Sequence, residues 1–183
     1  ILSIGYKADM IKDYFGDGST LGVNISYNIE EELLGTGGAV KDIVNKFQIN
    51  EDFILVWGDN INNFNVSEMK KIHDSHNGLI TMSLTKREDV ENWGVATLIG
   101  NKIVGFVEKP KREEASSNLI NAGAFIINPK ALENFSEGKS SIEKVCFEPL
   151  SKKGKIFAQF HKGYWFPTDN LEKYEFACKS LKN

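Results

Sequence analysis

A cluster of glycines leads directly into an amphipathic pattern, and this junction constrains the fold most. Residues 34–40 read LGTGGAV, and apolar residues then recur every three or four positions, at Ala39, Val40, Ile43, Val44 and Phe47. This spacing predicts a helix with one apolar stripe and with the glycines in its first turn. A bare first turn with unpaired N–H groups can accept a planar or anionic ligand, so a nucleotide could bind here. Alternatively, glycine only supplies the backbone angles of a tight turn.

Composition narrows the class of protein. The 183 residues are 41% hydrophobic, which is enough for one domain with its own core. The net charge is −3, and lysines and arginines are scattered, so we expect no nucleic-acid partner. No run approaches the roughly 18 apolar residues of a membrane span, so we expect no membrane partner either. Cys146 and Cys178 lack metal-ligand spacing and indicate core residues or reduced thiols of a cytoplasmic protein.

Strand and helix patterns alternate along the first half of the chain, and hairpin signals follow in the second. We expect strands near residues 1–5 and over 23–29, a helix over 8–15, and a strand buried on both faces over 53–57. A hairpin around Gly100-Asn101 and a strand over 118–127 follow. Helix starts are predicted at Asn65, Asn128, Ser140 (a capping box with Glu143) and Asn170. The pattern predicts an α/β fold with a mixed, mostly parallel sheet.

Two aspartates each follow an apolar strand pattern. Asp59 comes after the run over 53–57, and Asp169 comes after residues 164–166. Strand ends on one side of a parallel sheet converge, so the two carboxylates could face each other and hold Mg²⁺ together with substrate phosphates. Alternatively, Asp59 is a turn residue and Asp169 is a helix N-cap. His73 and His76, at i and i+3, could also bind a metal, but a solvated helix face is the preferred interpretation.

Three short motifs carry groups suited to a sugar phosphate. In Glu108-Lys109-Pro110 the carboxylate can accept sugar hydroxyls and the lysine can meet a phosphate, with proline ending the strand. Trp93-Gly94-Val95 and Asn121-Ala122-Gly123 each place a small residue beside a flat or polar side chain, as where a ligand passes close to backbone. An exposed charge pair on an edge strand is the alternative for the first motif.

Taken in order, these motifs resemble those of the sugar-1-phosphate nucleotidylyltransferases along the whole chain. The resemblance rests on the stretch over 34–40, Gly58-Asp59, Gly163-Tyr164-Trp165 and the three motifs above. It implies a Rossmann-like three-layer α/β/α nucleotide-diphospho-sugar transferase fold. It also implies an enzyme that transfers a nucleotidyl group from a nucleoside triphosphate to a sugar 1-phosphate, giving a nucleotide-sugar and pyrophosphate. The nucleobase and the sugar are left open.

The resemblance also implies roles for individual residues. The base pocket would be lined by Gly35, Thr36, Gly37 and Gly38. The sugar would be held by Gly94, Glu108 and Asn121. The catalytic residues would be Asp59, Lys109 and Asp169, with Lys109 on the sugar phosphate and both aspartates on Mg²⁺.

The chain departs from the family pattern in two places. Pro167 stands where many members carry the second metal aspartate, and Asp169 follows two residues later, as in the cytidylyltransferase branch. The family's N-terminal phosphate loop, with its arginine and a following lysine, has no counterpart. We therefore expect residues 1–183 to be a single catalytic domain that lacks the first βα unit and is inactive alone. An unpaired sheet edge would then favour a partner chain, as in a homo-oligomer.

Two other functional classes stay open. A protein that keeps the pocket without the triphosphate loop would be a non-catalytic, regulatory nucleotide-sugar-binding module. A glycosyltransferase on a related fold is less favoured, because Gly58-Asp59-Asn60 lacks the second aspartate of the Asp-x-Asp pattern that the resemblance associates with that class.

Overall fold

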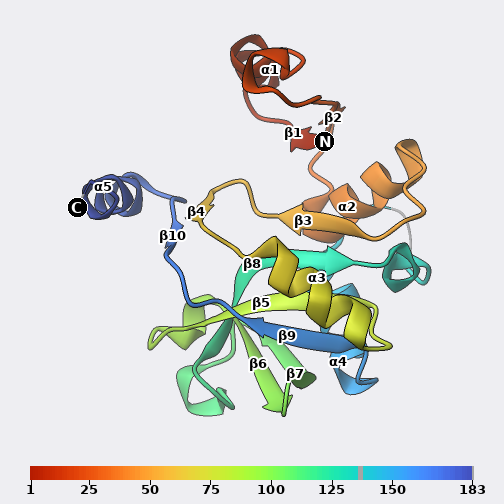
Figure 1. Ribbon diagram of the computed structural model, residues 1–183, viewed down its shortest axis with the longest axis vertical. Helices are drawn as coiled ribbons and strands as arrows, with labels where there is room; N and C mark the ends of the chain where they lie inside the picture. Colours follow the sequence, from red (N-terminus) through yellow and green to blue (C-terminus); the bar gives the residue numbers. More distant parts are fainter. Residues whose placement is uncertain (136–137, 183) are drawn as a thin grey trace.

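A six-stranded sheet forms the centre of the computed structural model, which describes residues 1–135 and 138–182. The strands lie in the order β3-β8-β5-β9-β7-β6 (Figure 1). Their bounds are Phe53–Val56 for β3, Leu119–Ile127 for β8, Ile80–Lys86 for β5, Ile156–Phe160 for β9, Lys102–Glu108 for β7 and Gly94–Ile99 for β6. The predicted hairpin is confirmed, since β6 and β7 pair around Gly100-Asn101.

Helices cover both faces of this sheet. On one face Met69 of α3 (Val66–Ser75) packs with Ala124 and Ile126 of β8. On the other face Phe125 and Ile127 join a larger core with residues from α2 (Gly35–Lys46) and the π-helical turn η5 (Glu143–Phe147), which leads into α4 (Glu148–Lys152). Successive β8 residues thus serve opposite cores, as a period of two requires. The expected three layers are confirmed (Figure 1).

The sheet is mixed, but the prediction that it is mostly parallel is wrong. β3, β5 and β9 run in one direction, yet β8 lies between β3 and β5 and is antiparallel to both. β7 is antiparallel to β6 and to β9. Among the described residues, neighbouring strands of this sheet are therefore antiparallel except for β5 and β9, which form its one parallel ladder.

Two smaller sheets flank the central one. β1 (Leu2–Ile4) pairs in parallel with β2 (Tyr27–Ile29), with α1 (Ala8–Phe15) between them in sequence. β2 is shorter than predicted because residues 23–26 form an irregular segment, in which the Ile25 N–H donates to the Asp17 carbonyl. β4 (Asn60–Asn62) pairs antiparallel with β10 (Trp165–Pro167), ahead of α5 (Leu171–Ser180). No helix in the described part of the chain is long and apolar enough to cross a membrane.

Strand β3 does not match its prediction as a strand buried on both faces. It lies at one end of the six-stranded sheet, and Ile54 and Val56 are 50% and 44% exposed. A largely apolar hollow of about 540 Å³ lies between β1 and β3, with Leu2 and Leu55 among its walls. An apolar run indicates a strand, but it does not say how many neighbours the strand has.

Side-chain caps account for several helix starts. The Asn65 side chain accepts a hydrogen bond from the Glu68 N–H at 3.0 Å, which confirms the start of α3. Asn128 accepts from the Lys130 N–H at 3.1 Å, but the element it opens is a short 3₁₀ turn, Pro129–Leu132. The N-cap of α5 is Asn170, which accepts from the Lys173 N–H at 3.0 Å, so Asp169 is free of that role.

Candidate active site

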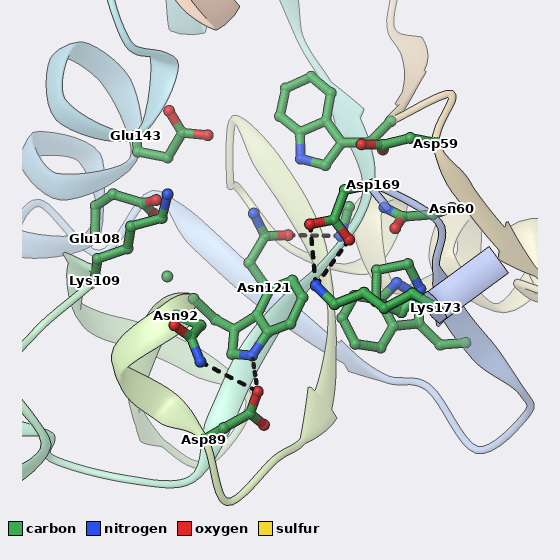
Figure 2. Close-up of a pocket in the computed structure, with 16 residues that line it drawn as sticks. Asp59, Asn60, Asp89, Asn92, Glu108, Lys109, Asn121, Glu143, Asp169 and Lys173 are labelled. Atoms are coloured by element: carbon green, nitrogen blue, oxygen red, sulfur yellow. Dashed lines mark hydrogen bonds and ion pairs between the residues drawn. The ribbon is translucent and has the colours of Figure 1, made fainter. Parts of the chain in front are cut away.

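One cavity of about 520 Å³ opens beside the β4–β10 pair, at the start of β6 and the end of β7 (Figure 2). It brings together six of the residues singled out from the sequence: Asp59, Gly94, Glu108, Lys109, Asn121 and Asp169. These residues come from five segments of the chain that are far apart in sequence. The fold therefore collects acidic, basic and amide groups in a single hollow.

Glu108 and Lys109 line the same wall although they are neighbours in sequence. Side chains along a strand alternate between its faces, but β7 ends at Glu108, and Lys109 has a φ of 48°. This left-handed conformation, uncommon without glycine, turns the Lys109 side chain to the cavity beside Glu108 (Figure 2). The Lys109 N–H donates to the Trp93 carbonyl at 3.0 Å, which holds the bend.

Gly94 makes room for the Glu108 carboxylate. A Cβ at position 94 would lie 2.8 Å from Glu108 Oε2 and 2.3 Å from Phe106 Cζ, so any side chain would displace both groups. Asn121 faces the cavity from β8, and its Oδ1 accepts a hydrogen bond from the Gly123 N–H at 2.8 Å. That bond leaves the Asn121 amide NH₂ free to donate to a ligand.

Glu143 is a cavity residue that the sequence interpretation missed. It lies in η5 and is only 9% exposed, and its Oε2 accepts hydrogen bonds from Thr36 Oγ1 at 2.9 Å and Ser141 Oγ at 2.7 Å. These two hydroxyl groups fix the orientation of the Glu143 carboxylate. A π-helical turn is itself a signal for a functional site, but such a turn is not visible in sequence.

The predicted capping box of Ser140 and Glu143 is wrong. Ser141 Oγ accepts from the Lys144 N–H at 3.4 Å, while Ser140 Oγ is buried and has no partner in the described structure. Glu143 accepts hydrogen bonds both from Ser141 at the helix start and from Thr36 of α2. The hydroxyl that contacts the first turn is thus that of Ser141, one residue after the predicted cap, and Glu143 also connects this turn to α2.

Glu108 lies beside two other carboxylates. Burial, and then the neighbouring Glu143, raise the pKa of Glu108 to about 7, although Lys109 opposes the shift. Glu148 adds to the effect, and its Oε1 is 3.5 Å from the Glu108 backbone N. Glu108 can therefore donate a proton in a hydrogen bond near neutral pH.

Asp59 and Asp169 reach the cavity through the β4–β10 pair. Asn60 is opposite Pro167 in that ladder, and Thr168 donates from its N–H and its hydroxyl to the Asp59 carbonyl, at 2.8 and 2.7 Å. Both carboxylates consequently lie on one side of the cavity (Figure 2). Their proximity results from an antiparallel ladder and not from the ends of parallel strands.

These two carboxylates suit a hard cation that is only partly enclosed by protein. Residues 1–135 and 138–182 contain no group of three His, Cys, Asp or Glu side chains able to enclose a metal. Mg²⁺ commonly binds through one or two carboxylates and keeps waters and substrate phosphates as its other ligands. The donor set fits Mg²⁺ shared with a phosphate ligand.

Lys173, which the sequence interpretation also missed, binds Asp169. Its Nζ lies 2.8 and 3.0 Å from the two carboxylate oxygens of Asp169, which precedes α5 by two residues. This hydrogen bond lowers the pKa of Asp169. The same ammonium lies 5.3 Å from the centre of the Trp93 ring, a distance typical of a cation–π contact.

Asp89 anchors the tryptophan wall of the cavity. Its Oδ2 accepts from Trp93 Nε1 at 3.0 Å, and its Oδ1 accepts from Arg87 Nε at 2.8 Å. The Arg87 hydrogen bond is the main reason that the pKa of Asp89 is held well below its usual range. Trp93 packs edge to face against Trp165 with ring centres 5.1 Å apart. The flat wall is therefore fixed from both sides.

The glycine cluster borders a neighbouring hollow. α2 begins at Gly35, as the pattern predicts, and Gly35 and Thr36 line this hollow together with Glu108 and Lys109. Gly37 and Gly38 are buried against residues 138–142. The Gly37 N–H donates to the Ser140 carbonyl at 2.9 Å, so packing already requires part of the cluster. A role of the cluster in binding a base stays a prediction.

His73 lies outside this site. The preferred interpretation, that it lies on a solvated helix face, is wrong. His73 is buried, with Nδ1 3.0 Å from Thr81 Oγ1 and Nε2 3.4 Å from Asp52 Oδ2. Burial lowers the pKa of His73. His73 is thus a hydrogen-bonded core residue, and His76 follows the end of α3.

The chain belongs to the family of the nucleotidyl transferases, whose pattern matches residues 1–182. A D-glycero-alpha-D-manno-heptose 1-phosphate guanylyltransferase of Aneurinibacillus thermoaerophilus is 32% identical over 186 residues, which cover 100% of this chain and 78% of that protein. A mannose-1-phosphate guanylyltransferase of Mycobacterium tuberculosis is 30% identical over 169 residues, which cover 90% of this chain and 46% of that protein.

Solved structures place the fold in the same family. The crystal structure of HddC from Yersinia pseudotuberculosis superposes with a TM-score of 0.76 and 28% identity, covering 98% of this chain and 77% of that one. The chain spans about half the length of most of the curated relatives that it matches. The α/β nucleotidyltransferase fold implied by the motifs is thereby confirmed.

Proposed function

We propose that this chain forms the sugar-phosphate site of a sugar-1-phosphate nucleotidylyltransferase. The observation that carries the proposal is the single cavity that combines Asp59 and Asp169 with Lys109 and the polar groups of Glu108 and Asn121. In the reaction, a phosphate oxygen of the sugar 1-phosphate attacks the α-phosphorus of a nucleoside triphosphate. The bond to the β-phosphate breaks, and pyrophosphate leaves.

The cavity residues divide this work. Lys109 meets the phosphate of the sugar 1-phosphate as a point charge, while Glu108, Asn121 and the buried Glu143 bind sugar hydroxyls. Asp59 and Asp169 hold Mg²⁺, which when bound supplies positive charge to phosphate oxygens. Phosphoryl transfer depends mainly on positioning and charge neutralisation, which these groups provide.

We further propose that the nucleotide is a guanosine phosphate and the sugar a mannose or manno-heptose 1-phosphate. The names of the relatives from Mycobacterium tuberculosis and Aneurinibacillus thermoaerophilus support this choice. Gly35 and Thr36 border the adjoining hollow and form part of the base site, with Gly37 and Gly38 behind them. The free thiols of Cys146 and Cys178 support a cytoplasmic setting.

A thermal-shift panel tests the proposal. GDP-mannose, UDP-glucose and dTDP-glucose are added to the 183-residue chain with and without Mg²⁺, and pyrophosphate release from GTP and mannose 1-phosphate is measured in parallel. A ligand at about 100 times its Kd stabilises the folded state by roughly 2.7 kcal/mol. We expect the largest shift with GDP-mannose and Mg²⁺, and its loss in Asp59→Ala but not in the surface control Asp9→Ala.

Two results would decide against parts of the proposal. Binding without turnover, also in a longer chain from the natural protein, would favour the non-catalytic module. Absence of any nucleotide-sugar shift would reject the site itself.

A further inference from the structure

We propose that Lys173 occupies the metal position at Asp169 and neutralises this carboxylate until a divalent metal displaces the lysine. The displaced Lys173 then binds the phosphate of the ligand. This inference rests on the proposed function, because that function makes Asp169 a metal ligand. It concerns a residue on α5 that no motif singled out. The contact that carries it is the placement of one ammonium on both oxygens of Asp169.

The ammonium and a metal compete for the same carboxylate. Lys173 Nζ lies 2.8 and 3.0 Å from the two oxygens of Asp169, so it occupies the position between them from which this carboxylate could bind a cation with both oxygens. Mg²⁺ requires carboxylate oxygens at about 2.1 Å, and two positive centres at one carboxylate repel each other. A metal that binds between these oxygens therefore displaces Lys173.

The ion pair between Lys173 and Asp169 is weak enough for a metal to displace the lysine. Its two side chains are 38% and 50% exposed, and exposed pairs of this kind contribute little to stability. A divalent ion shared with Asp59 has the larger charge and a second carboxylate, so it wins the exchange. The Trp93 ring, 5.3 Å from Nζ, lets Lys173 keep a favourable contact after it leaves Asp169.

The released ammonium stays inside the cavity. Lys173 and Lys109 line the same hollow, and Figure 2 shows the Lys173 head group directed to the cavity below Asp169. Asp89 cannot recapture it readily, because Trp93 and Arg87 already occupy that carboxylate. A phosphate in the cavity would then face two lysines, and the exchange would couple metal binding to phosphate binding.

Binding of Mn²⁺ alone, followed by its electron paramagnetic resonance signal, tests the exchange without any reaction. We compare the parent with Lys173→Met and with Lys179→Met, a control that removes the same charge from the exposed end of α5. We expect Lys173→Met to bind Mn²⁺ about two- to fivefold more tightly, the range that loss of an exposed ion pair allows. The control should match the parent.

A second background shows whether the gain passes through Asp169. In Asp169→Asn the amide no longer binds an ammonium strongly, so adding Lys173→Met should change Mn²⁺ affinity little. Equal affinity of Lys173→Met and the parent would overturn the proposal. A gain that persists in Asp169→Asn would overturn it as well, because the effect would then be general electrostatics.

Mannose 1-phosphate tests the second half of the proposal. With saturating Mn²⁺, we expect Lys173→Met to bind it several-fold more weakly than the parent or Lys179→Met, although the variant binds Mn²⁺ alone more tightly. Parent-like binding of mannose 1-phosphate would overturn this half. If the parent itself binds no sugar phosphate, the proposed function fails, and the Mn²⁺ measurements still decide the exchange.

Discussion

Glu108 is the cavity residue whose pKa is raised by burial together with neighbouring carboxylates, against the opposing effect of two lysines. The groups around it are Glu143, Glu148, Lys109 and Lys144, and its pKa is raised to about 7 from an ordinary value of 4.5. The folded state therefore binds more protons than the unfolded state between these two pH values. The stability that this residue contributes is complete below about pH 4.5 and is lost as the pH rises through about 7.

We expect Glu108→Gln, which cannot ionise, to gain stability relative to the parent as the pH rises. The gain between about pH 5 and about pH 8 should be on the order of 1 kcal/mol, since a partly exposed group realises only part of its shift. Urea unfolding at both pH values measures it, and Glu175→Gln on the exposed surface of α5 is the control. A difference from the parent that is the same at both pH values would contradict the assignment.

Lys109 provides a second test at the scale of a single residue. Its ammonium reaches the cavity because of the bend at φ 48°, and we assign it to the sugar phosphate. Lys109→Ala should weaken binding of mannose 1-phosphate by about tenfold or more, and that of free mannose much less, since a charge-assisted hydrogen bond contributes roughly 1.5–3 kcal/mol. Calorimetry with both ligands measures this, with the exposed Lys111→Ala as control. Equal losses for the two ligands would refute the assignment.

At this scale the sequence predicts residues that lie in short motifs and misses those that depend on packing. Glu108, Lys109 and Asp59 follow strand ends and could be found. Glu143 could not, because its carboxylate is placed by a π-helical turn, by the nearby Ser141 hydroxyl and by the Thr36 hydroxyl from a distant segment. Lys173 follows Asp169 by four residues, but its place in the cavity depends on the pairing of β10 with the distant β4, which the sequence does not reveal.

At the scale of elements, the contact of α2 with the segment before η5 connects the glycine cluster to Glu143. A Cβ at Gly37 would lie 2.7 Å from Ser140 Oγ and 2.9 Å from the Ile142 backbone N. The Thr36 hydroxyl also accepts from the Ile142 N–H, at 3.0 Å. Small residues here let the two segments approach closely enough for Thr36 to hold Glu143.

Gly37→Ala should therefore push these segments apart. Overpacking typically costs about 1–3 kcal/mol, which exceeds the gain of up to about 1 kcal/mol that alanine brings to a helix. We expect a net loss of about 1–2 kcal/mol in urea unfolding, together with weaker sugar binding through Glu143. Gly58→Ala is the control, since a Cβ there meets nothing within 4 Å. Unchanged stability of Gly37→Ala would show that the segment can shift freely.

The elements themselves were predictable where their signals are local. The cap at Asn65, the turn at Gly100-Asn101 and the apolar stripe of α2 each depend on neighbours in sequence. β4 was missed because Asn60 and Asn62 are poor strand formers and pair only with distant β10. Strand directions were misjudged because alternating strand and helix patterns do not reveal where β8 returns between β3 and β5.

At the scale of the whole molecule, the open end of the sheet at β3 favours association. Within the described residues β3 pairs only with β8, and its half-exposed Ile54 and Val56 lie beside the apolar hollow near β1. Strand edges with apolar side chains readily pair with other chains. Absence of the family's first βα unit and formation of a homo-oligomer both stay predictions.

We expect Ile54→Lys to reduce concentration-dependent association. A charge on an edge strand opposes pairing with another chain, and at a half-exposed position it should change the free energy of unfolding by about 1 kcal/mol or less. Sedimentation velocity over a range of concentrations measures the association. Leu171→Lys, at an exposed apolar position on α5 and away from strand edges, is the control. Similar behaviour of both variants would exclude the β3 edge as the cause.

The hydrogen bond from the Thr168 N–H to the Asp59 carbonyl has a consequence for how this site can be observed. The amide proton of Thr168 exchanges with solvent only when the segments that carry the two aspartates separate. Its exchange rate thus reports how often the site opens, and it can be measured without any ligand. If the Thr168 amide exchanges slowly in the free protein, the two aspartates are already in place when a cation and a phosphate bind.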